Sequence, residues 1–304
     1  MSRLNAGGFS FPLSYNQTAN FQLETEIVGT LFIVPTPIGN LEDITLRALR
    51  VLREVALIAA EDTRTTRKLL NHFQITSPLT SYHEHNKLTK LETIFNALEN
   101  GDVALVSDAG TPGISDPGFE LIQEAILRGI RIEPLPGANA AITALVASGL
   151  PADNFMFVGF LPKKAKARAD ALHALKPQTC TLIAYESPNR LIELLEAIIE
   201  VLGDRPVCVA REITKIHEEF FRGSASDALT HYREHSPRGE VVVIIGGAAP
   251  EMTPVWDETQ VRSRLLERLA AGDSLKDAAK AISGESGWDR RRVYQIGLDA
   301  KNSP

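Results

Sequence analysis

The chain has 304 residues, of which 44% are hydrophobic, and its formal net charge is −6. This length and composition are typical of a globular protein with two domains, or with two domains and an appendage. The net charge argues against indiscriminate nucleic-acid binding, but it allows a local basic patch that docks on RNA. Its two cysteines, Cys180 and Cys208, each lie in an apolar run, which favours buried free thiols in a reducing compartment over a disulfide framework.

The N-terminal segment carries Asn, Gln, Ser and Thr where a signal peptide would have an apolar core, so we expect residues 1–26 to form a disordered tail. No run of about 18 uninterrupted apolar residues occurs, so the sequence predicts no membrane span. Because the two cysteines favour a reducing compartment, we expect the protein to be cytoplasmic.

From Thr30 onward, short β-branched runs alternate with amphipathic segments, a pattern typical of βαβ units and of a mainly parallel sheet covered by helices. We expect strands at 31–34, 56–60, 79–82, 103–106 and 130–135, and helices at 44–52, 64–73, 88–98 and 119–127. A further helix from 136 ends at Gly149 and Pro151, and we place the end of a first α/β domain, residues 27–150, there.

A second α/β domain, residues 151–250, is expected to have strands with fewer intervening helices and mixed pairing, and the two lobes should enclose a cleft. Its predicted strands are 155–160, 180–185, 207–211, 218–222 and 240–245. Residues 251–304 follow, with helical patterns at 261–270, 275–282 and 290–297. Three short helices with a glycine turn before a basic one fit a helix-turn-helix-like RNA-binding module, and a small helical cap is the alternative.

The segment Val106–Gly118 is an unusually long glycine-proline loop between a predicted strand and a predicted helix. A purely structural connection there needs only about two to six residues, so the extra length indicates a ligand. A second rigid loop, Val34–Asn40, ends the first strand and shares the carboxyl edge of the sheet, where open α/β folds bind ligands. The signature loops of P-loop and dinucleotide-binding proteins are absent, which disfavours ATP hydrolysis and dinucleotide redox chemistry.

His83 and His85 are spaced like metal ligands on one strand face, but no cysteine pair or third ligand lies near them in sequence. We therefore expect no metal site. His217 is likewise interpreted as a polar rim residue.

Seven motifs carry a resemblance to a known family, and they extend over nearly the whole chain from about Gly29. They are residues 34–40, 60–64, 81–86, 107–118, 134–139, 185–190 and 210–215. On these motifs the chain resembles the tetrapyrrole methylases, a family of S-adenosylmethionine-dependent methyltransferases, and in particular those members that methylate a cytidine ribose 2′-hydroxyl in 16S rRNA. Residues 238–240 and the helical tail also match, and a longer N-terminal tail is the departure.

The resemblance implies a two-lobed tetrapyrrole methylase-like fold with S-adenosylmethionine in a cleft between the lobes, commonly in a homodimer. It also implies which residues line the cofactor. From the first lobe these are Pro37, Asp108, Gly110, Thr111, Ser115, Asp116, Pro136 and Ala138, and from the second Tyr185, Ala210, Arg211, Glu212 and Gly239.

A sulfonium methyl is already activated, so the enzyme must mainly place the 2′-oxygen and exclude water. A general base, or a cation that stabilises the developing alkoxide, would help. The candidates are Glu61, Asp62, Arg64 and His83, of which we favour Asp62 and Arg64. An ordinary acidic helix N-terminus explains Glu61 and Asp62 equally well.

Two basic clusters are expected to contact RNA phosphates. One follows a predicted strand and consists of Lys163, Lys164, Lys166 and Arg168; the other opens the last helix and consists of Arg290, Arg291 and Arg292. A solvated helix start is the alternative for the first cluster. Trp288 and Tyr294 are predicted to pack the helical module rather than to stack on bases.

Two classes of function remain. The favoured one is 2′-O-methylation of a cytidine in 16S rRNA of the small ribosomal subunit. The alternative is a small-molecule methyltransferase acting on a tetrapyrrole-like precursor, which would need neither the helical tail nor the lysine-rich loop. A non-enzymatic RNA-binding module is a third, more distant hypothesis.

Overall fold

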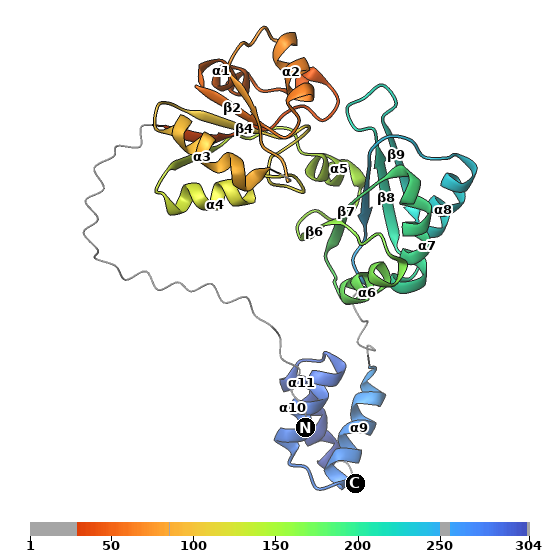
Figure 1. The fold of residues 1–304 in the computed structure, drawn as a ribbon. Coiled ribbons are helices and arrows are strands. Elements are labelled where there is room, and N and C mark those ends of the chain that lie inside the picture. Colours follow the sequence, from red (N-terminus) through yellow and green to blue (C-terminus); the bar gives the residue numbers. More distant parts are fainter. Residues whose placement is uncertain (1–28, 85, 250–255, 303–304) are drawn as a thin grey trace, which may run out of the picture. The chain divides into compact units, whose positions relative to one another are not determined.

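The computed structural model describes residues 29–84, 86–249 and 256–302, and the chain divides into two compact units, Met1–Asn139 and Ala140–Pro304 (Figure 1). The expected disordered tail and His85 lie outside the described residues. Within the described segments, no helix combines the length and the apolar character that crossing a bilayer requires.

The first unit contains a five-stranded sheet with the order β3-β2-β4-β1-β5, in which every pairing is parallel. This confirms the expected parallel sheet. Its strands are β1 (Thr30–Ile33), β2 (Leu57–Ala60), β3 (Leu79–Ser81), β4 (Val103–Val106) and β5 (Arg131–Pro134).

Helices cover both faces of this sheet, with α1 and α2 on one side and α3 and α4 on the other (Figure 1). Successive residues of β4 therefore enter different cores: Ala104 and Val106 pack toward α1 and α2, whereas Val103 and Leu105 pack toward α3 and α4. Burial on both faces is why this strand is apolar throughout rather than alternating. The helices are α1 (Leu46–Glu54), α2 (Thr63–His72), α3 (Lys87–Leu98) and α4 (Phe119–Leu127), with a short 3-10 helix η1 (Leu41–Asp43).

The second unit contains a five-stranded sheet with the order β6-β7-β10-β8-β9. Only β6 and β7 pair in parallel, and the other pairings are antiparallel, which confirms the expected mixed sheet. Its strands are β6 (Phe155–Phe160), β7 (Thr181–Glu186), β8 (Pro206–Arg211), β9 (Glu219–Ser224) and β10 (Val241–Ile245).

Three helices lie between these strands, more than the sequence pattern indicated: α6 (Ala165–Leu175), α7 (Leu191–Leu202) and α8 (Ala225–Glu234), with a 3-10 helix η2 (Pro188–Arg190) before α7. They pack on one face of the sheet. The side chains that α8 buries are Ala225, Ala228 and Tyr232. Two of these are small, so the apolar periodicity of this helix is weak in sequence.

Helix α5 (Ala140–Ser148) opens the second unit rather than closing the first, so the boundary falls after Asn139 instead of near residue 150. It buries Ala141, Ala144 and Leu145 and contacts the strands of the second sheet, on the side away from α7 and α8 (Figure 1). The sequence shows an apolar helix here, but periodicity alone does not reveal which sheet the helix covers.

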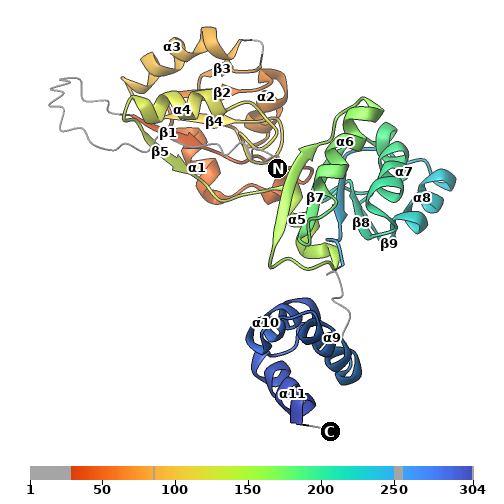
Figure 2. The same cartoon turned by 90° about the horizontal axis from the view of Figure 1, so that it is seen from below.

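The C-terminal residues form three helices, as expected: α9 (Glu258–Ala270), α10 (Leu275–Ser286) and α11 (Arg290–Asn302) (Figure 2). They share a core that includes Val261, Ile282 and Val293. Trp288 packs against this core, and its indole N–H donates to the Trp256 carbonyl at 2.7 Å. Trp288 therefore has the packing role that was expected of it.

Candidate functional site

The two loops singled out in the sequence meet at the carboxyl edge of the first sheet. Thr36, after β1, and Gly110, after β4, form an isolated antiparallel bridge in which each N–H donates to the other residue's carbonyl at 2.9 Å. The Thr36 hydroxyl also donates to the Ser107 carbonyl at 3.1 Å. These contacts hold both loops in one arrangement.

The loop after β4 has an unusual backbone conformation. Gly110 has a φ of 78°, and Ser115 has a φ of 65°, a value that a non-glycine side chain rarely adopts. The Thr111 hydroxyl donates to the Ala138 carbonyl at 3.1 Å, which joins the loop that follows β5 to the same edge. The structure thus brings together all three loops that supply the predicted first-lobe cofactor residues.

Three carboxylates crowd this edge, and burial is the largest cause of the raised pKa of each one. The pKa of Asp116 rises to about 6, because burial and the negative charges of Glu61 and Asp108 outweigh a hydrogen bond from Ser107. Glu61 accepts a hydrogen bond from the Asp108 backbone N–H at 3.3 Å, and Asp108 accepts one from the Asp62 backbone N–H at 3.1 Å. Partly desolvated, mutually repelling carboxylates are typical of a functional site.

Asp62 and Arg64, the favoured catalytic pair, are bound to each other in this structure. Asp62 is the N-cap of α2, and its carboxylate accepts hydrogen bonds from the backbone and the guanidinium of Arg64, with an ion-pair distance of 2.7 Å. These hydrogen bonds lower the pKa of Asp62 to about 2. Asp62 thus starts a helix, as the alternative interpretation of this segment expected, and its low pKa makes it a weak base.

His83 follows β3, and its backbone N–H donates to the Asn86 side chain at 2.8 Å. Its charge acts on Glu61 and lowers the pKa of that carboxyl, although burial has the larger, opposite effect. Glu61 and His83 are thus electrostatic neighbours at the same edge of the sheet.

A cavity of about 220 Å³ opens at this edge, between the two loops and the start of α2. It contains two of the predicted cofactor residues, Pro37 and Asp108. The complete lining is Thr36, Pro37, Leu41, Thr65, Thr66, Lys68, Leu69, Ser107 and Asp108.

In the second unit, the predicted residues gather at one edge of the sheet. Tyr185 of β7 and Ala210 of β8 both pair with Val242 of β10, one on each side. Both strands run antiparallel to β10, so their carboxyl ends lie at the same edge. The ring of Tyr185 makes edge contacts with Phe157 and Phe160, at centroid distances of 5.0 and 5.6 Å.

Arg211, Glu212 and Gly239 meet at this edge. Arg211 pairs with Glu219 at 2.7 Å and donates to the Arg238 carbonyl at 3.2 Å. The Glu212 carboxylate accepts from the Lys215 ammonium at 2.8 Å, which is the largest cause of its lowered pKa. Gly239 has a φ of 76°, and any side chain there would collide with the Glu212 carboxylate.

The basic cluster after β6 divides into two kinds of residue. Lys163, Lys164 and Lys166 are exposed, and no acidic side chain among the described residues pairs with them. Arg168 is different: its side chain is 6% exposed and pairs with Glu193 at 3.2 Å. The hypothesis that Arg168 contacts RNA is corrected accordingly, because position 168 faces the core of its helix layer.

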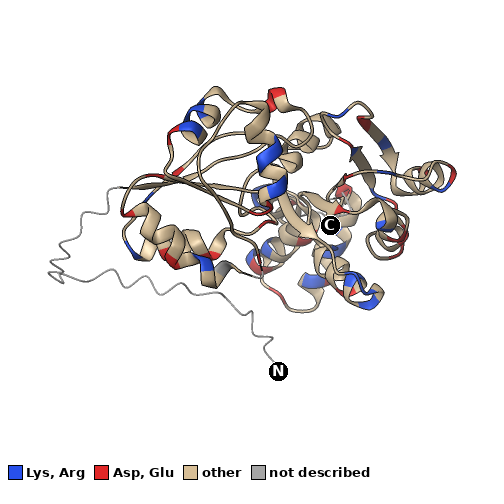
Figure 3. Cartoon of the chain, turned by 45° about the horizontal axis from the view of Figure 1, so that its top comes forward, with Lys and Arg blue, Asp and Glu red and all other residues tan. Residues whose placement is uncertain are grey.

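Arg290, Arg291 and Arg292 are exposed at the start of α11. The guanidinium of Arg292 lies 4.4 Å from the ring centroid of Trp288, so this residue also fastens the module. Elsewhere, cations and acids are interspersed along the helices, in keeping with the modest net charge (Figure 3). The three exposed lysines and these arginines therefore remain candidates for RNA contact.

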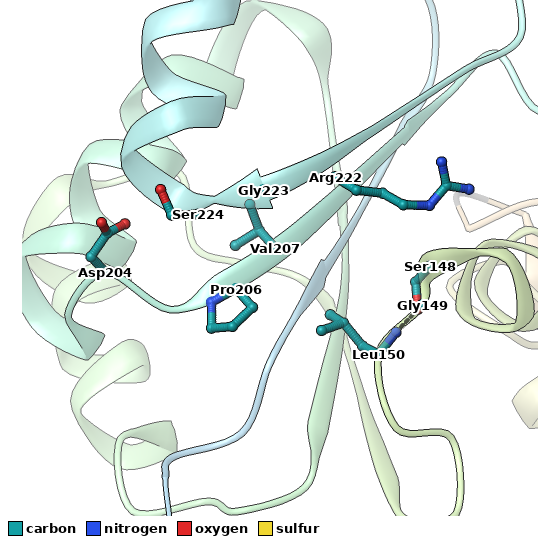
Figure 4. A pocket seen from close by; sticks show the side chains of 9 residues that line it. All are labelled: Ser148, Gly149, Leu150, Asp204, Pro206, Val207, Arg222, Gly223 and Ser224. Atoms are coloured by element: carbon teal, nitrogen blue, oxygen red, sulfur yellow. Dashed lines mark hydrogen bonds between the residues drawn. The ribbon is translucent and has the colours of Figure 1, made fainter.

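A second, larger cavity of about 460 Å³ lies where β8 begins and β9 ends, at the opposite end of these strands from Arg211 (Figure 4). Arg222 supplies a cation there, but its guanidinium donates to the Ala147 carbonyl at 2.6 and 3.0 Å. Asp204 accepts from the backbone and hydroxyl of Ser226 at 2.8 and 2.6 Å. The charged groups of this cavity are thus engaged within the protein.

In the part of the chain that the structure describes, no three His, Cys, Asp or Glu side chains are arranged to hold a metal ion. Both cysteines are buried and free, as expected.

The chain is similar to curated proteins named ribosomal RNA small subunit methyltransferase I. The protein from Halalkalibacterium halodurans is 49% identical over 272 residues, which are 88% of this chain and 94% of that protein. The protein from Escherichia coli O157:H7 is 47% identical over 275 residues, 89% of this chain and 95% of that one. The protein from Thermotoga maritima is 48% identical over 221 residues, 72% of this chain but 99% of that one, so it has no counterpart to the remainder.

Solved structures show the same fold. Uroporphyrin-III-C-methyltransferase from Thermus thermophilus superimposes with a TM-score of 0.52 at 23% identity, covering 72% of this chain and 95% of that one. Cobalt precorrin-4 methyltransferase superimposes with a TM-score of 0.54 at 17% identity, covering 71% and 94%. Residues 30–229 match the family of tetrapyrrole (corrin/porphyrin) methylases. The chain therefore belongs to this family and, within it, to the ribosomal RNA small subunit methyltransferase I group of S-adenosylmethionine-dependent methyltransferases.

Proposed function

We propose that this chain methylates the ribose 2′-hydroxyl of a cytidine in 16S rRNA, within the small ribosomal subunit. The observation that carries the proposal is the similarity of about nine-tenths of the chain to proteins named as methyltransferases of small-subunit rRNA. The proposed site of action is the cytoplasm, where ribosomal subunits are assembled, and the proposed active form is a homodimer.

The three loops at the carboxyl edge of the first sheet are the proposed cofactor site. When bound, S-adenosylmethionine supplies an activated methyl group on a sulfonium. The positive φ values of Gly110 and Ser115 bend this loop sharply, and the backbone polar groups of the loop that are not used in the Thr36–Gly110 bridge are proposed to hold the methionine end. The crowded carboxylates of Asp108 and Asp116 fit a ligand with an ammonium and a sulfonium, because a cation relieves their mutual repulsion.

The same site uses the other residues of these loops and a set from the second unit. Thr111, Pro37, Pro136 and Ala138 are proposed to shape it from the first unit. Tyr185, Ala210, Arg211, Glu212 and Gly239 are the proposed contributors of the second unit.

We assign the general base to Glu61 rather than to Asp62. A carboxyl with a raised pKa binds a proton more readily, and burial raises the pKa of Glu61. Asp62 has a pKa of about 2 and is occupied by Arg64, so its role is to start α2 and to orient that guanidinium. Arg64, whose side chain is 87% exposed, is the proposed cation for the developing alkoxide, held in place by Asp62. His83 tunes Glu61.

Recognition of the RNA is assigned to Lys163, Lys164 and Lys166 and to the three helices α9–α11. Exposed lysines bind phosphates without regard to sequence, whereas the module positions the substrate and performs no chemistry.

Nucleoside mass spectrometry tests the proposal. Ribosomal RNA from cells that lack the gene should contain one 2′-O-methylcytidine fewer than wild-type rRNA. Small subunits purified from those cells should accept a labelled methyl group from S-adenosylmethionine in the presence of the protein. Unchanged modification in the deletion strain, or transfer to a tetrapyrrole precursor but not to the subunit, would contradict the proposal.

A further inference from the structure

Phe160, the last residue of β6, has an aromatic side chain at the surface of the second unit. The residue is 58% exposed, and β6 stands at one end of the strand order. Its ring contacts the ring of Tyr185 at a centroid distance of 5.6 Å and an angle of 61° between the planes, so Tyr185 does not stack on it. A single exposed apolar side chain needs no explanation, so what lies next to Phe160 decides its meaning.

Three cations follow Phe160 within six residues. The side chains of Lys163, Lys164 and Lys166 are exposed, and no acidic side chain among the described residues pairs with them. The intervening sequence contains no acidic residue. An open aromatic ring and unpaired cations are the two features that bind single-stranded nucleic acid, because the ring stacks on a base and the cations bind the phosphates on either side. An apolar protein partner would account for the ring but not for the cations.

A buried ion pair fixes the loop that carries these groups. The guanidinium of Arg190 donates to the Leu161 carbonyl at 2.8 Å and pairs with the carboxylate of Glu186 at 2.8 Å. The Glu186 side chain is 0% exposed, and Leu161, which directly follows Phe160, is also buried. The ring and the start of the lysine loop are therefore held in place before RNA arrives, which reduces the entropy lost on binding. Glu186 and Arg190 belong to the motif at 185–190, in which only Tyr185 has a proposed role so far.

The register of the sheet places this surface beside the proposed cofactor residues of the second unit. Phe160 pairs with Tyr185 across β6 and β7, and the contact between their rings shows that both project from the same face of the sheet. Phe160 and Tyr185 also lie at the carboxyl ends of two parallel strands. A base held at Phe160 is thus next to a residue that is proposed to contact the methyl donor.

We infer that Phe160 is a stacking platform for an unpaired base of the substrate RNA, that the lysines at 163, 164 and 166 bind the adjoining phosphates, and that the Glu186–Arg190 pair holds the platform in position. The inference rests on the proposed function. Recognition of RNA commonly uses unstacked bases that lie against aromatic side chains in this way.

The test measures binding of the protein to small subunits purified from cells that lack the gene, over a series of salt concentrations. Phe160→Ala should raise the Kd about tenfold, the usual effect of losing one base stacked on an aromatic side chain. Phe160→Tyr keeps the ring and should bind within about twofold of wild type. Phe155→Ala, at the other end of β6 and 41% exposed, is the matched control and should bind like wild type.

Two further measurements separate stacking from other roles of the side chain. The salt dependence of binding should be the same in Phe160→Ala and wild type, because stacking releases no counterions. Calorimetric affinity for S-adenosylmethionine should also be unchanged. Phe160→Leu keeps an apolar side chain against Tyr185 but has no flat ring, so it should weaken binding of the subunit even if Phe160→Ala fails to fold.

Several results would overturn the inference. Wild-type affinity in Phe160→Leu and Phe160→Ala would show that no base stacks there. An equal loss in Phe155→Ala would mean that the whole edge of β6 is covered, as in an interface with a second copy of the chain. A flattened salt dependence would assign the loss to the lysines, and weakened cofactor binding would assign Phe160 to the cofactor. A wild-type protein that transfers no methyl group to the subunit would refute the proposed function, an outcome distinct from an active wild type with variants that bind equally well.

Discussion

Asp116 makes the stability of the ligand-free protein depend on pH. Its pKa rises from 3.8 to about 6, chiefly because folding removes the carboxyl from water. Below about pH 4 both folded and unfolded states hold the proton, and the group contributes nothing. Between about pH 4 and pH 6 the unfolded chain releases the proton while the folded chain retains it, so stability falls as pH rises. Above about pH 6 the loss is complete.

The interval between these two pKa values corresponds to about 3 kcal/mol. Asp116 remains partly exposed, so solvent screening reduces the expected effect to about 1–2 kcal/mol. Asp116→Asn keeps the shape of the side chain but cannot ionise. This variant should therefore gain about 1–2 kcal/mol of unfolding free energy at pH 8 and much less at pH 4.5.

Urea unfolding of the ligand-free protein between about pH 4.5 and pH 8 measures this difference. Asp43→Asn, at an exposed position on η1, is the matched control and should show no such trend. A gain in Asp116→Asn that is equal at both ends of the pH range would mean that a hydrogen bond or packing, not ionisation, is responsible. No gain at pH 8 would refute the desolvation argument itself.

Three further predictions concern binding and RNA. Gly110→Val should weaken calorimetric S-adenosylmethionine binding, whereas Gly129→Val, with a similar φ of 69° but open space around it, should not; equal affinities for the two variants would count against the cofactor loop. Reversing the three exposed lysines at 163, 164 and 166 to Glu should weaken RNA binding and flatten its salt dependence while cofactor affinity is kept, and an unchanged salt slope would contradict phosphate contact. Truncation after Ala249 should leave a folded, cofactor-binding protein with much reduced methylation of the subunit, and full-length activity in the truncated protein would favour the cap interpretation of α9–α11.

Much of the fold follows from the sequence, because the apolar runs of the first unit mark strands that are buried on both faces. Strand Val103–Val106 was located to the residue in this way, and the helical pattern Phe119–Leu127 also has the predicted bounds. Helix α5 could not be assigned to a sheet from its sequence. Its residues predict an apolar helix, but Ala141, Ala144 and Leu145 would suit either sheet, and only tertiary packing decides which one they cover.

The loop conformation at the candidate site was predictable from the glycines and prolines of the sequence. Glycines and prolines in a long loop after a strand indicate a ligand from the sequence alone. In the structure, the Thr36–Gly110 bridge joins this loop to the loop after β1. Arg168 could not be told from its neighbouring lysines, because charge in sequence does not show burial. The same holds for Asp62, whose low pKa depends on Arg64 and on the start of α2.

Several features that lower stability coincide at the carboxyl edge of the first sheet. The pKa of Asp116 is raised because burial and neighbouring negative charges disfavour its ionised form. Ser115 has a positive φ, and the buried hydroxyl of Thr66 has no hydrogen-bond partner among the described residues. Each one alone would be a local imperfection in an otherwise well-packed unit. Ser115 and Asp116 lie in the loop after β4, which is the proposed cofactor loop, and Thr66 lies on the neighbouring helix α2. We expect the crowded carboxylates to become less unfavourable once a cationic ligand binds beside them, so cofactor binding should stabilise this part of the protein.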